Sequence, residues 1–490
     1  MDFQRILAPS EYAEGDPLPG IGKDVMGRRL PSMLALGLLA GCVAYQPAPV
    51  DVGARVAQRA GSTLDPAQAR VTAQRIAPDA PSPAGGFDRL TLFAAMLDHD
   101  PKVAQARAAI VSAQADARVS RQGPGPTFTL STEYANDPTT SSPWLLGASV
   151  DLPLDRGEQR KARLDRADLA VVIARYDYAE TLWSERIALR RALIDGEIAR
   201  RQVALGTEMQ ALRDRQIAAM ERQAASGEIA GALLSPIRAL RAQEARALDD
   251  AKGKVLTSQA TIAGLLGVPA STLSGFDIAW GDFDAPAADP ASAITPDMRL
   301  RAISARSDVL RALAAYDQAE ADVRLEIAMQ YPTISLTPGY TWERGLTKLP
   351  LSINLSLPSF DLNRAAIRSA LAKRDEAGTA IEAAIASAQG ALDAALVERR
   401  AAWAALTRLR ETELPQTQAS ADRAQTQLAQ GQIARADWAD AQLAALSARL
   451  GALDALARVQ AADAALEDAL RRPLEGPEMK IDADKLERGQ

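Results

Sequence analysis

The sequence predicts a mainly helical chain that also supplies strands to a membrane β-barrel, and two observations support this class. The first is an internal duplication at an offset of about 206 residues. Each copy runs helix, two strand-like segments, very long helix, glycine turn and helix. The second is the composition: aromatic residues make up only 4%, and Ala, Leu, Arg, Gln and Glu dominate long stretches. Such a composition is typical of long helices or coiled coils.

The composition and charge exclude several classes of function. The formal net charge of -6 is spread over mixed signs without a basic patch, so no nucleic-acid partner is predicted. His99 is the only histidine and Cys42 the only cysteine, which excludes histidine-dependent catalysis and histidine-based metal sites. The sequence also contains no phosphate-binding loop. We therefore predict no enzyme activity, no catalytic residue, no cofactor and no metal site.

The residues before Cys42 predict an export signal. Two arginines precede a short apolar run over 30–40, which is the pattern of a secretory signal peptide over residues 1–41. The run is too short to span a bilayer. The residues Leu39-Ala40-Gly41-Cys42 resemble a bacterial lipobox, in which the cysteine is lipidated and becomes the mature N-terminus. An ordinary signal peptide with an incidental cysteine is the alternative.

The remaining boundaries follow from composition and from the repeat. Residues 1–25 are polar and precede Met26, so we interpret them as an over-extended gene start. No other run of about 18 apolar residues is present, so no helix is predicted to cross a membrane. The other predicted segments are a lipidated tether over 42–86, a first repeat over 87–267, a linker over 268–297, a second repeat over 298–472 and a flexible polar tail over 473–490.

The predicted helices match in length within each copy. They span 88–121, 158–225 and 228–266 in the first copy, and 298–329, 363–429 and 432–471 in the second. The middle helix of the first copy has about 68 residues, or ~100 Å, and its two partners total about 73 residues. We therefore expect two shorter helices stacked end to end beside each long one. Apolar residues spaced by seven, such as Leu248, Val255 and Ile262, predict antiparallel coiled-coil packing.

The strand-like segments occupy about 127–152 in the first copy and about 332–357 in the second. In the first strand Phe128, Leu130 and Tyr134 share one face, and the opposite face carries hydroxyl residues and a glutamate. The other strands alternate in the same way. Each has about 9–11 residues, the length that crosses a bilayer at a tilt with an apolar outer face and a polar lumen.

Four strands cannot close a transmembrane barrel, and lipid does not tolerate an open sheet edge. Closure therefore requires an oligomer, and three chains would give an even number of twelve strands. The alternative is a soluble four-stranded sheet that caps a helical stalk. The strands alone leave both possibilities open.

Taken together, these features resemble the TolC family of outer-membrane efflux proteins over nearly all of 87–472. A turn with proline and then aspartate leads each second strand into its long helix: Pro153 and Asp155 in the first copy, Pro358 and Asp361 in the second. Proline ends a strand and aspartate caps the following helix. The second turn has Asn363 where such proteins often have glycine. The stretch Leu-Pro-Leu-Asp-Arg-Gly-Glu-Gln-Arg around the first turn leans toward the heavy-metal efflux branch.

The resemblance implies a homotrimer with a twelve-stranded barrel in the outer membrane and a twelve-helix tunnel across the periplasm. Such proteins carry out no chemistry. They dock on a periplasmic adaptor, a membrane fusion protein, which links them to an inner-membrane pump. The resemblance and the lipobox place the chain in the outer membrane, anchored in lipid through Cys42 and coupled to a pump of the RND type.

Glycine turns mark the far ends of the helical hairpins. The tips contain Gly227 with Ile229, and Gly431 with Ile433, and glycine gives the backbone freedom that a tight helix-to-helix turn requires. In the TolC family these tips meet the adaptor. Some members carry a gating arginine two residues after the second glycine, where this chain has Ile433. The resemblance therefore implies that the closed state is held by other residues.

Two aspartates follow the second tip. Asp437 and Asp440 lie six and nine residues after Gly431, which is the family's offset, and one helical turn apart on one face. In a trimer they would form two rings of three carboxylates, which would narrow the mouth and favour cations. A solvated helix face is the alternative.

The sequence thus predicts the exit duct of a tripartite efflux system that exports small molecules or metal ions. Two other functions remain open from the sequence. One is the outer-membrane channel of type I protein secretion, and the other is a periplasmic coiled-coil lipoprotein without a pore. The identity of the exported substrate cannot be predicted, because a duct wall of mixed polar residues is permissive.

Overall fold

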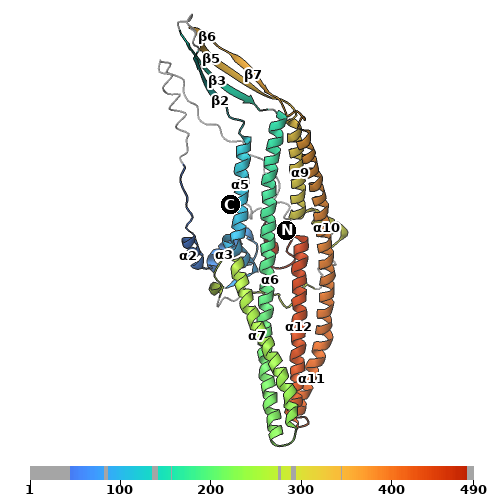
Figure 1. Ribbon diagram of the computed structural model, residues 1–490. Helices are drawn as coiled ribbons and strands as arrows, with labels where there is room; N and C mark the ends of the chain where they lie inside the picture. Colours follow the sequence, from blue (N-terminus) through green and yellow to red (C-terminus); the bar gives the residue numbers. More distant parts are fainter. Residues whose placement is uncertain are drawn as a thin grey trace.

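The chain is elongated, with a β-sheet at one end and helical hairpin tips at the other (Figure 1). The computed structural model describes residues 45–81, 86–134, 142–155, 157–273, 278–287, 294–343 and 345–482. The predicted signal peptide over 1–41 and the lipidation site Cys42 lie outside the described residues. Midway between the two ends, the described parts of the predicted tether, linker and tail lie around the long helices. We call this region the belt.

The first repeat contains one uninterrupted long helix. α6 (Gly157–Ala225) has 69 residues, in agreement with the helix predicted over 158–225. α4 (Arg89–His99) and α5 (Pro101–Arg121) replace the single helix predicted over 88–121. Asp100 divides them, because Pro101 favours a helix start and the Asp100 carboxylate accepts a hydrogen bond from the Lys102 backbone N at 2.7 Å. After the tip, η2 (Gly231–Leu233) leads into α7 (Leu234–Leu265).

The second repeat follows the same order with more interruptions. The helix predicted over 298–329 is divided into α8 (Pro296–Ser304) and α9 (Ser307–Ala328). The helix predicted over 363–429 consists of α10 (Arg364–Arg408), a π-helical turn η4 (Leu409–Glu413) and α11 (Leu414–Ala429). The π-turn lies just before Pro415, whose missing N–H interrupts the helical hydrogen-bond ladder. The repeat ends with α12 (Arg435–Leu470).

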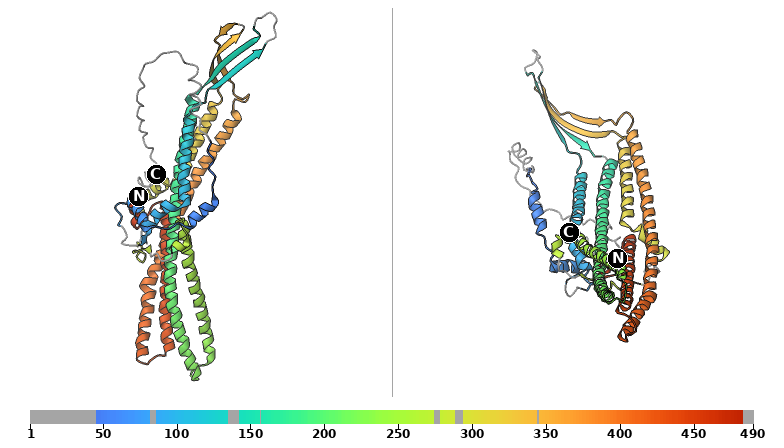
Figure 2. Two further views of the ribbon diagram at one scale, coloured as in Figure 1. Left: turned by 90° about the vertical axis from the view of Figure 1, so that its left-hand side faces the viewer. Right: turned by 60° about the horizontal axis from the view of Figure 1, so that its bottom comes forward.

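The shorter helices stack along the long ones as their lengths predict. α5 and α7 both pack on α6, and α9 and α12 both pack on α10. In Figure 1, α5 lies nearer the sheet and α7 nearer the tips, and α9 and α12 divide α10 in the same way. α12 also packs on α6, which joins the two repeats. α5, α6, α9 and α10 stand side by side beneath the sheet (Figure 2).

The sheet consists of β2 (Thr127–Tyr134), β3 (Trp144–Leu154), β5 (Thr333–Glu343), β6 (Leu346–Lys348) and β7 (Leu351–Ser356). Its order is β2-β3-β5, and both β6 and β7 pair with β5. β6 and β7 form one interrupted strand position, since Pro350 separates them and cannot donate to the ladder. All of the pairings are antiparallel.

The belt contains segments for which regular packing was not predicted. Residues 42–86 were expected to form an irregular tether, yet α2 (Val52–Ala60) and α3 (Pro66–Ile76) occur there, and α3 buries Ala69, Ala73 and Ile76. The tail over 473–490 was expected to be flexible, and this is wrong for its described part. Ile481 is buried in the core, and the Asp482 backbone N donates to the Ile76 carbonyl at 2.8 Å.

The linker between the repeats also joins the belt. β1 (Phe87–Asp88) pairs in parallel with β4 (Ile278–Ala279), so the start of the first repeat is held against the predicted linker. η3 (Ala270–Leu273) follows α7, and η5 (Pro477–Lys480) lies in the C-terminal segment. Phe87, Leu92 and Phe93 are almost fully buried in the core beneath these segments.

A buried network of ions holds the C-terminal segment to the long helices. Three arginines and three glutamates form it: Arg89, Arg186, Arg190, Glu467, Glu475 and Glu478. The Glu467 carboxylate of α12 accepts from Arg186 at 3.1 Å and from Arg190 at 3.0 Å, both on α6. Arg190 also donates to Glu475 at 2.8 Å. Because the charges balance inside the core, each glutamate depends on arginines from other elements.

One helical stretch has the length and composition of a membrane span. Residues 364–429 include an 18-residue window with mean hydropathy 1.3, of which 22% is buried within the chain. The window is rich in alanine, which keeps a helix apolar but narrow. No span was predicted here. Its low burial leaves an exposed, small-residue helix face.

We predict that the substitution Glu467→Gln strongly destabilises the belt. It leaves Arg186 and Arg190 without their shared carboxylate, and breaking a buried ion pair costs about 3–5 kcal/mol. Thermal unfolding of the detergent-solubilised protein, followed by circular dichroism, measures the effect. The control is Glu398→Gln, whose partner Arg458 is exposed and which should cost only about 0–1 kcal/mol. Equal melting temperatures for the two variants would contradict the prediction.

Candidate functional site

The sheet has one polar and one apolar face. The register places Thr129 opposite Ser149 and Ser149 opposite Gly339, so small and hydroxyl side chains share one face. On the other face, Leu130 lies opposite Ala148, which lies opposite Tyr340. The alternation predicted from the sequence is therefore present across several strands.

A carboxylate organises the polar face near the helices. Asp151 of β3 accepts hydrogen bonds from the Ser335 hydroxyl at 2.6 Å, from the Thr337 hydroxyl and from the Asn354 amide at 3.2 Å. Asn354 also donates to the Thr337 hydroxyl at 2.9 Å. These contacts join β3, β5 and β7 through side chains as well as backbone.

The apolar face of the sheet is not covered by any of the residues that the structure describes. Leu130 is 76% exposed, and the other large exposed apolar residues of the strands include Phe128, Tyr134, Trp144, Leu146, Leu152, Ile334, Tyr340, Leu351, Ile353 and Leu355. The rings of Tyr134 and Trp144 pack edge to face at 5.0 Å at the end of the sheet far from the helices. Phe360 is fully exposed at the opposite end, just after β7. Aromatic residues thus lie at both margins of an apolar band.

The two edges of the sheet are open. In the part of the chain that the structure describes, β2 pairs only with β3, and β7 pairs only with β5. Their outer N–H and C=O groups have no ladder partner in this sheet. An exposed edge of this kind is a template for a strand of another chain.

The strand-to-helix turns at the helical side of the sheet differ between the repeats. After Pro153, the Asp155 carboxylate accepts from the Arg163 guanidinium at 2.7 Å, and Arg163 also donates to the Ser120 carbonyl at the end of α5. After Pro358, the Asp361 carboxylate accepts from the Ser359 hydroxyl at 2.7 Å. It also accepts backbone N–H groups at the start of α10.

The backbone conformation and the hydrogen bonds of Asn363 explain why an asparagine occupies this position of the second turn. Its φ is 60°, in the left-handed region where asparagine is the commonest substitute for glycine. The Asn363 side-chain amide donates to the Glu326 carbonyl at 2.8 Å and to the Glu326 carboxylate at 2.7 Å. Asn363 therefore links α10 to α9 through its side chain.

Both hairpin tips turn on a glycine, as predicted. Gly227 has φ 78° and Gly431 has φ 71°. In the second tip the Gly431 N–H donates to Leu428 and the Gln432 N–H to Gln427, which is the Schellman pattern that ends a helix. The other predicted tip residues, Ile229 and Ile433, are half-buried beside their glycines.

The predicted aspartates have different surroundings. Both are exposed on the first turns of α12. The Asp437 carboxylate accepts from the Ala434 backbone N at 3.3 Å, which satisfies one free N–H at the helix start. The Asp440 carboxylate accepts from the Gln216 amide of α6 at 2.6 Å and lies 3.9 Å from the Arg213 guanidinium.

The residues of α6 that contact Asp440 were not predicted from the sequence. Arg213 and Gln216 are buried, and Arg213 donates to Glu244 of α7 at 2.7 Å. Charged and polar residues are frequent along α6, and only the crossing of three helices selects these two. The only local sequence signal for these two residues is their spacing of three, which places both side chains on one helix face.

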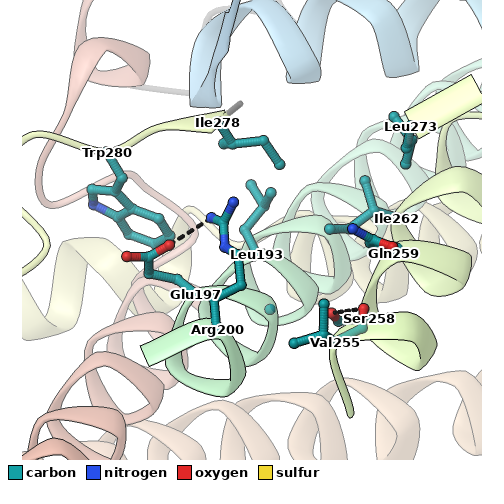
Figure 3. A pocket seen from close by; sticks show the side chains of 11 residues that line it. Leu193, Glu197, Arg200, Val255, Ser258, Gln259, Ile262, Leu273, Ile278 and Trp280 are labelled. Carbon is teal, nitrogen blue, oxygen red and sulfur yellow. Dashed lines mark hydrogen bonds and ion pairs between the residues drawn. The ribbon is translucent and has the colours of Figure 1, made fainter. Parts of the chain in front are cut away.

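The belt also contains a small pocket between α6, α7 and the linker (Figure 3). Its wall is mainly apolar, with Leu193, Val255, Ile262 and Trp280, and Glu197 pairs with Arg200 at its margin. Among the described residues, no group of three or more His, Cys, Asp or Glu side chains is placed to hold a metal ion.

Comparison with known proteins gives a family and a fold. The model of the family described as outer membrane efflux protein matches residues 92–268 and 300–470, which coincide with the two repeats. No curated protein matches the sequence.

Several solved structures share the fold. The Campylobacter jejuni CmeC outer membrane channel is 14% identical, and the match covers 96% of this chain and 97% of that chain with a TM-score of 0.66. CusC is 17% identical, with 80% and 96% covered and a TM-score of 0.64. The Neisseria gonorrhoeae MtrE outer membrane channel in its open state is 17% identical, with 78% and 89% covered and a TM-score of 0.61.

The turn at Asp361 gives a prediction about pH. Hydrogen bonds from the Ser359 hydroxyl and from backbone N–H groups hold the pKa of the Asp361 carboxyl below its ordinary value of 3.8. Their contribution to stability is therefore present above the ordinary pKa and is lost as the pH falls through the lower, folded-state pKa. We expect Asp361→Ala to increase hydrogen exchange of the Asn363 and Ala365 amides at neutral pH, and this difference to vanish in acid.

The control for this measurement is Asp375→Ala, an exposed aspartate further along α10. Amide protection factors measured by mass spectrometry between pH 7 and pH 2 test the prediction, because the folded-state pKa of Asp361 lies below 3.8. A difference between the Asp361 variant and the unsubstituted protein that persists at the lowest pH would contradict it.

Proposed function

The chain belongs to the outer membrane efflux protein family, and from this membership we propose that it forms the exit duct of a tripartite efflux system. Proteins of this family are channels, and the chain is accordingly not an enzyme. The family covers both repeats of the chain. The proposed assembly is a homotrimer in the outer membrane whose helices extend into the periplasm.

The observation that carries the proposal is the two-faced sheet with two open edges. Its apolar face is exposed, its polar face is lined by hydroxyl groups and Asp151, and β2 and β7 lack outer partners in the described chain. If β2 of one chain pairs with β7 of the next, three chains of four strand positions give twelve strands and leave no edge in lipid. The soluble sheet that the sequence left open would expose the whole apolar band to water.

The helical part supports the same stoichiometry. Each chain supplies four helical columns: α6, α10 with α11, and the two stacked pairs α5 with α7 and α9 with α12. Three chains would surround a tunnel with twelve columns. The exposed alanine-rich face within 364–429 suits close contact with a helix of a neighbouring chain, because small side chains let backbones approach.

The partners are inferred from position. Gly227, Ile229, Gly431 and Ile433 lie at the tips furthest from the sheet, and we propose that these tips contact a periplasmic adaptor. An inner-membrane pump, of the RND type, would drive export of small molecules or metal ions through the duct. Lipidation of Cys42 would anchor each chain in the outer membrane. Type I protein secretion uses the same fold, and only the choice of pump distinguishes it.

The mouth of the duct would lie just behind the second tip. Asp437 and Asp440 are exposed there on α12, and three chains would place six carboxylates around the axis. Fixed negative charge at a narrow opening concentrates cations and excludes anions.

We predict that the purified protein forms trimers that conduct ions in planar lipid bilayers. Trimer formation is read from heat-modifiable migration in gels, and conductance from single-channel recordings. Cys42→Ser should remove lipid labelling while leaving the trimer and its conductance in place, because the barrel itself holds the chain in lipid. A soluble, non-conducting protein would refute the channel.

A second prediction concerns the carboxylates. The double substitution Asp437→Asn with Asp440→Asn should lower cation selectivity and raise the half-blocking concentration of a trivalent cation by about tenfold or more, because six charges leave the mouth. Asp454→Asn is the control, since Asp454 is exposed on the same helix but further from the tip. Unchanged block in the double variant would show that these aspartates do not line the mouth.

A further inference from the structure

A continuous chain of side-chain contacts crosses three helices near the tips. Glu244 of α7 accepts from the Arg213 guanidinium of α6 at 2.7 Å. Arg213 donates to the Gln216 side-chain oxygen at 2.8 Å, and the Gln216 amide donates to Asp440 of α12 at 2.6 Å. Arg213 is therefore connected to Asp440 both through Gln216 and directly, at 3.9 Å.

The burial of these residues fixes where the charges lie. Arg213 is 7% exposed and Gln216 is 1% exposed, whereas the Asp440 side chain is 60% exposed. A buried guanidinium held by Glu244 and Gln216 cannot swing away from its neighbours. Its positive charge, which it shares with the Glu244 carboxylate, is thus a permanent part of the surroundings of Asp440, while the Asp440 carboxylate itself still faces solvent.

Asp437 differs in this respect. It accepts a backbone N–H of its own helix, and within the described residues it takes part in no ion pair. The two aspartates are one turn apart and similarly exposed, yet only Asp440 has an opposite charge beside it. Two carboxylate rings in a trimer would therefore carry unequal effective charge.

We propose that Arg213 is a selectivity-determining residue of the channel mouth, where it offsets the charge of Asp440 and leaves Asp437 as the dominant cation-attracting group. This inference rests on the proposed function, in which both aspartates line the mouth. Gln216 is a positioning residue, because its amide holds the Asp440 carboxylate toward Arg213 and α6. Arg213 itself does not reach the lumen and acts through the field that it creates.

The size of the effect follows from the distance. A cation beside Asp440 lies further from Arg213 than the carboxylate itself, which is 3.9 Å away. At about 8 Å, a unit charge changes the local concentration of a monovalent cation by about twofold even at the dielectric constant of water. The effect on a trivalent cation is larger, and it is repeated in each chain of the trimer. Removal of Arg213 should therefore be visible in cation block without any change in the carboxylates.

The test is block of single-channel currents by hexaamminecobalt(III) in planar bilayers, with the full-length trimer. Arg213→Gln should lower the half-blocking concentration by about fivefold or more and raise the permeability ratio of K⁺ over Cl⁻. The matched control is Arg241→Gln. Arg241 bonds Asp214 between the same two helices, but its side chain is 39% exposed, against 9% for Arg213, and it does not contact Asp440. Cation block of the Arg241 variant should therefore change by less than about twofold.

Gln216→Met provides a second test that leaves every charge in place. Without the amide, the Asp440 carboxylate is released from α6, and the half-blocking concentration should fall by about twofold or more. If Arg213→Gln does not form trimers, the Gln216→Met variant still tests the proposal. Block that is unchanged in Gln216→Met, or equal in Arg213→Gln and Arg241→Gln, would overturn the proposal.

The outcome separates this proposal from the channel function. If the double aspartate substitution weakens block while the Arg213 and Gln216 variants behave like the control, the aspartates line the mouth and Arg213 has only a structural role. If the aspartate substitution itself leaves block unchanged in a conducting trimer, the mouth assignment fails and the role of Arg213 fails with it.

Discussion

Because hydrocarbon offers no hydrogen-bond partner to a peptide group, a sheet with two open edges has no stable place in a bilayer unless other chains pair with it. Each chain here has such a sheet, with β2 and β7 at its edges and an apolar face exposed. The oligomer is therefore inferred from backbone hydrogen bonding rather than from any recognition motif. The duplication supplies half of the strand positions from each repeat, so neither repeat can form the wall alone.

The length of the helices creates a second requirement, in the middle of the molecule. Stacking two short helices beside one long helix leaves helix ends halfway along the body, where free carbonyl and N–H groups need partners. The belt supplies them. Arg59 of α2 donates to the His99 carbonyl at 3.2 Å and the Gly267 carbonyl at 3.1 Å, at the ends of α4 and α7. Arg306 donates to the Ala469 carbonyl of α12 at 2.8 Å.

These two requirements differ in how far the sequence reveals them. Strand alternation and the glycine tips are local patterns, and both are present in the structure. The two proline–aspartate turns differ, since Asp361 accepts a backbone N–H of the following helix whereas Asp155 pairs with Arg163. The belt was missed because its order comes from contacts distant in sequence: Glu475 is held by a hydrogen bond from Arg190, and Ile481 is buried in the core that contains Ile76. A polar segment after the last helix appears flexible until its partners are known. Asp100 and Pro415 gave usable local signals for helix breaks, which the periodicity of the long helices obscured.

The two aspartates of the candidate site show the same difference between what local sequence predicts and what distant contacts determine. Asp437 and Asp440 were identified by their offset from Gly431, which treats them as equivalent. The structure makes them unequal, since α6 crosses α12 at the height of Asp440 and brings Arg213 and Gln216 against it. Helix crossings depend on the packing of whole columns, so no short motif encodes them. In the proposed trimer, the effective charge of the mouth could therefore be changed by substitutions on α6, without any change to the two aspartates.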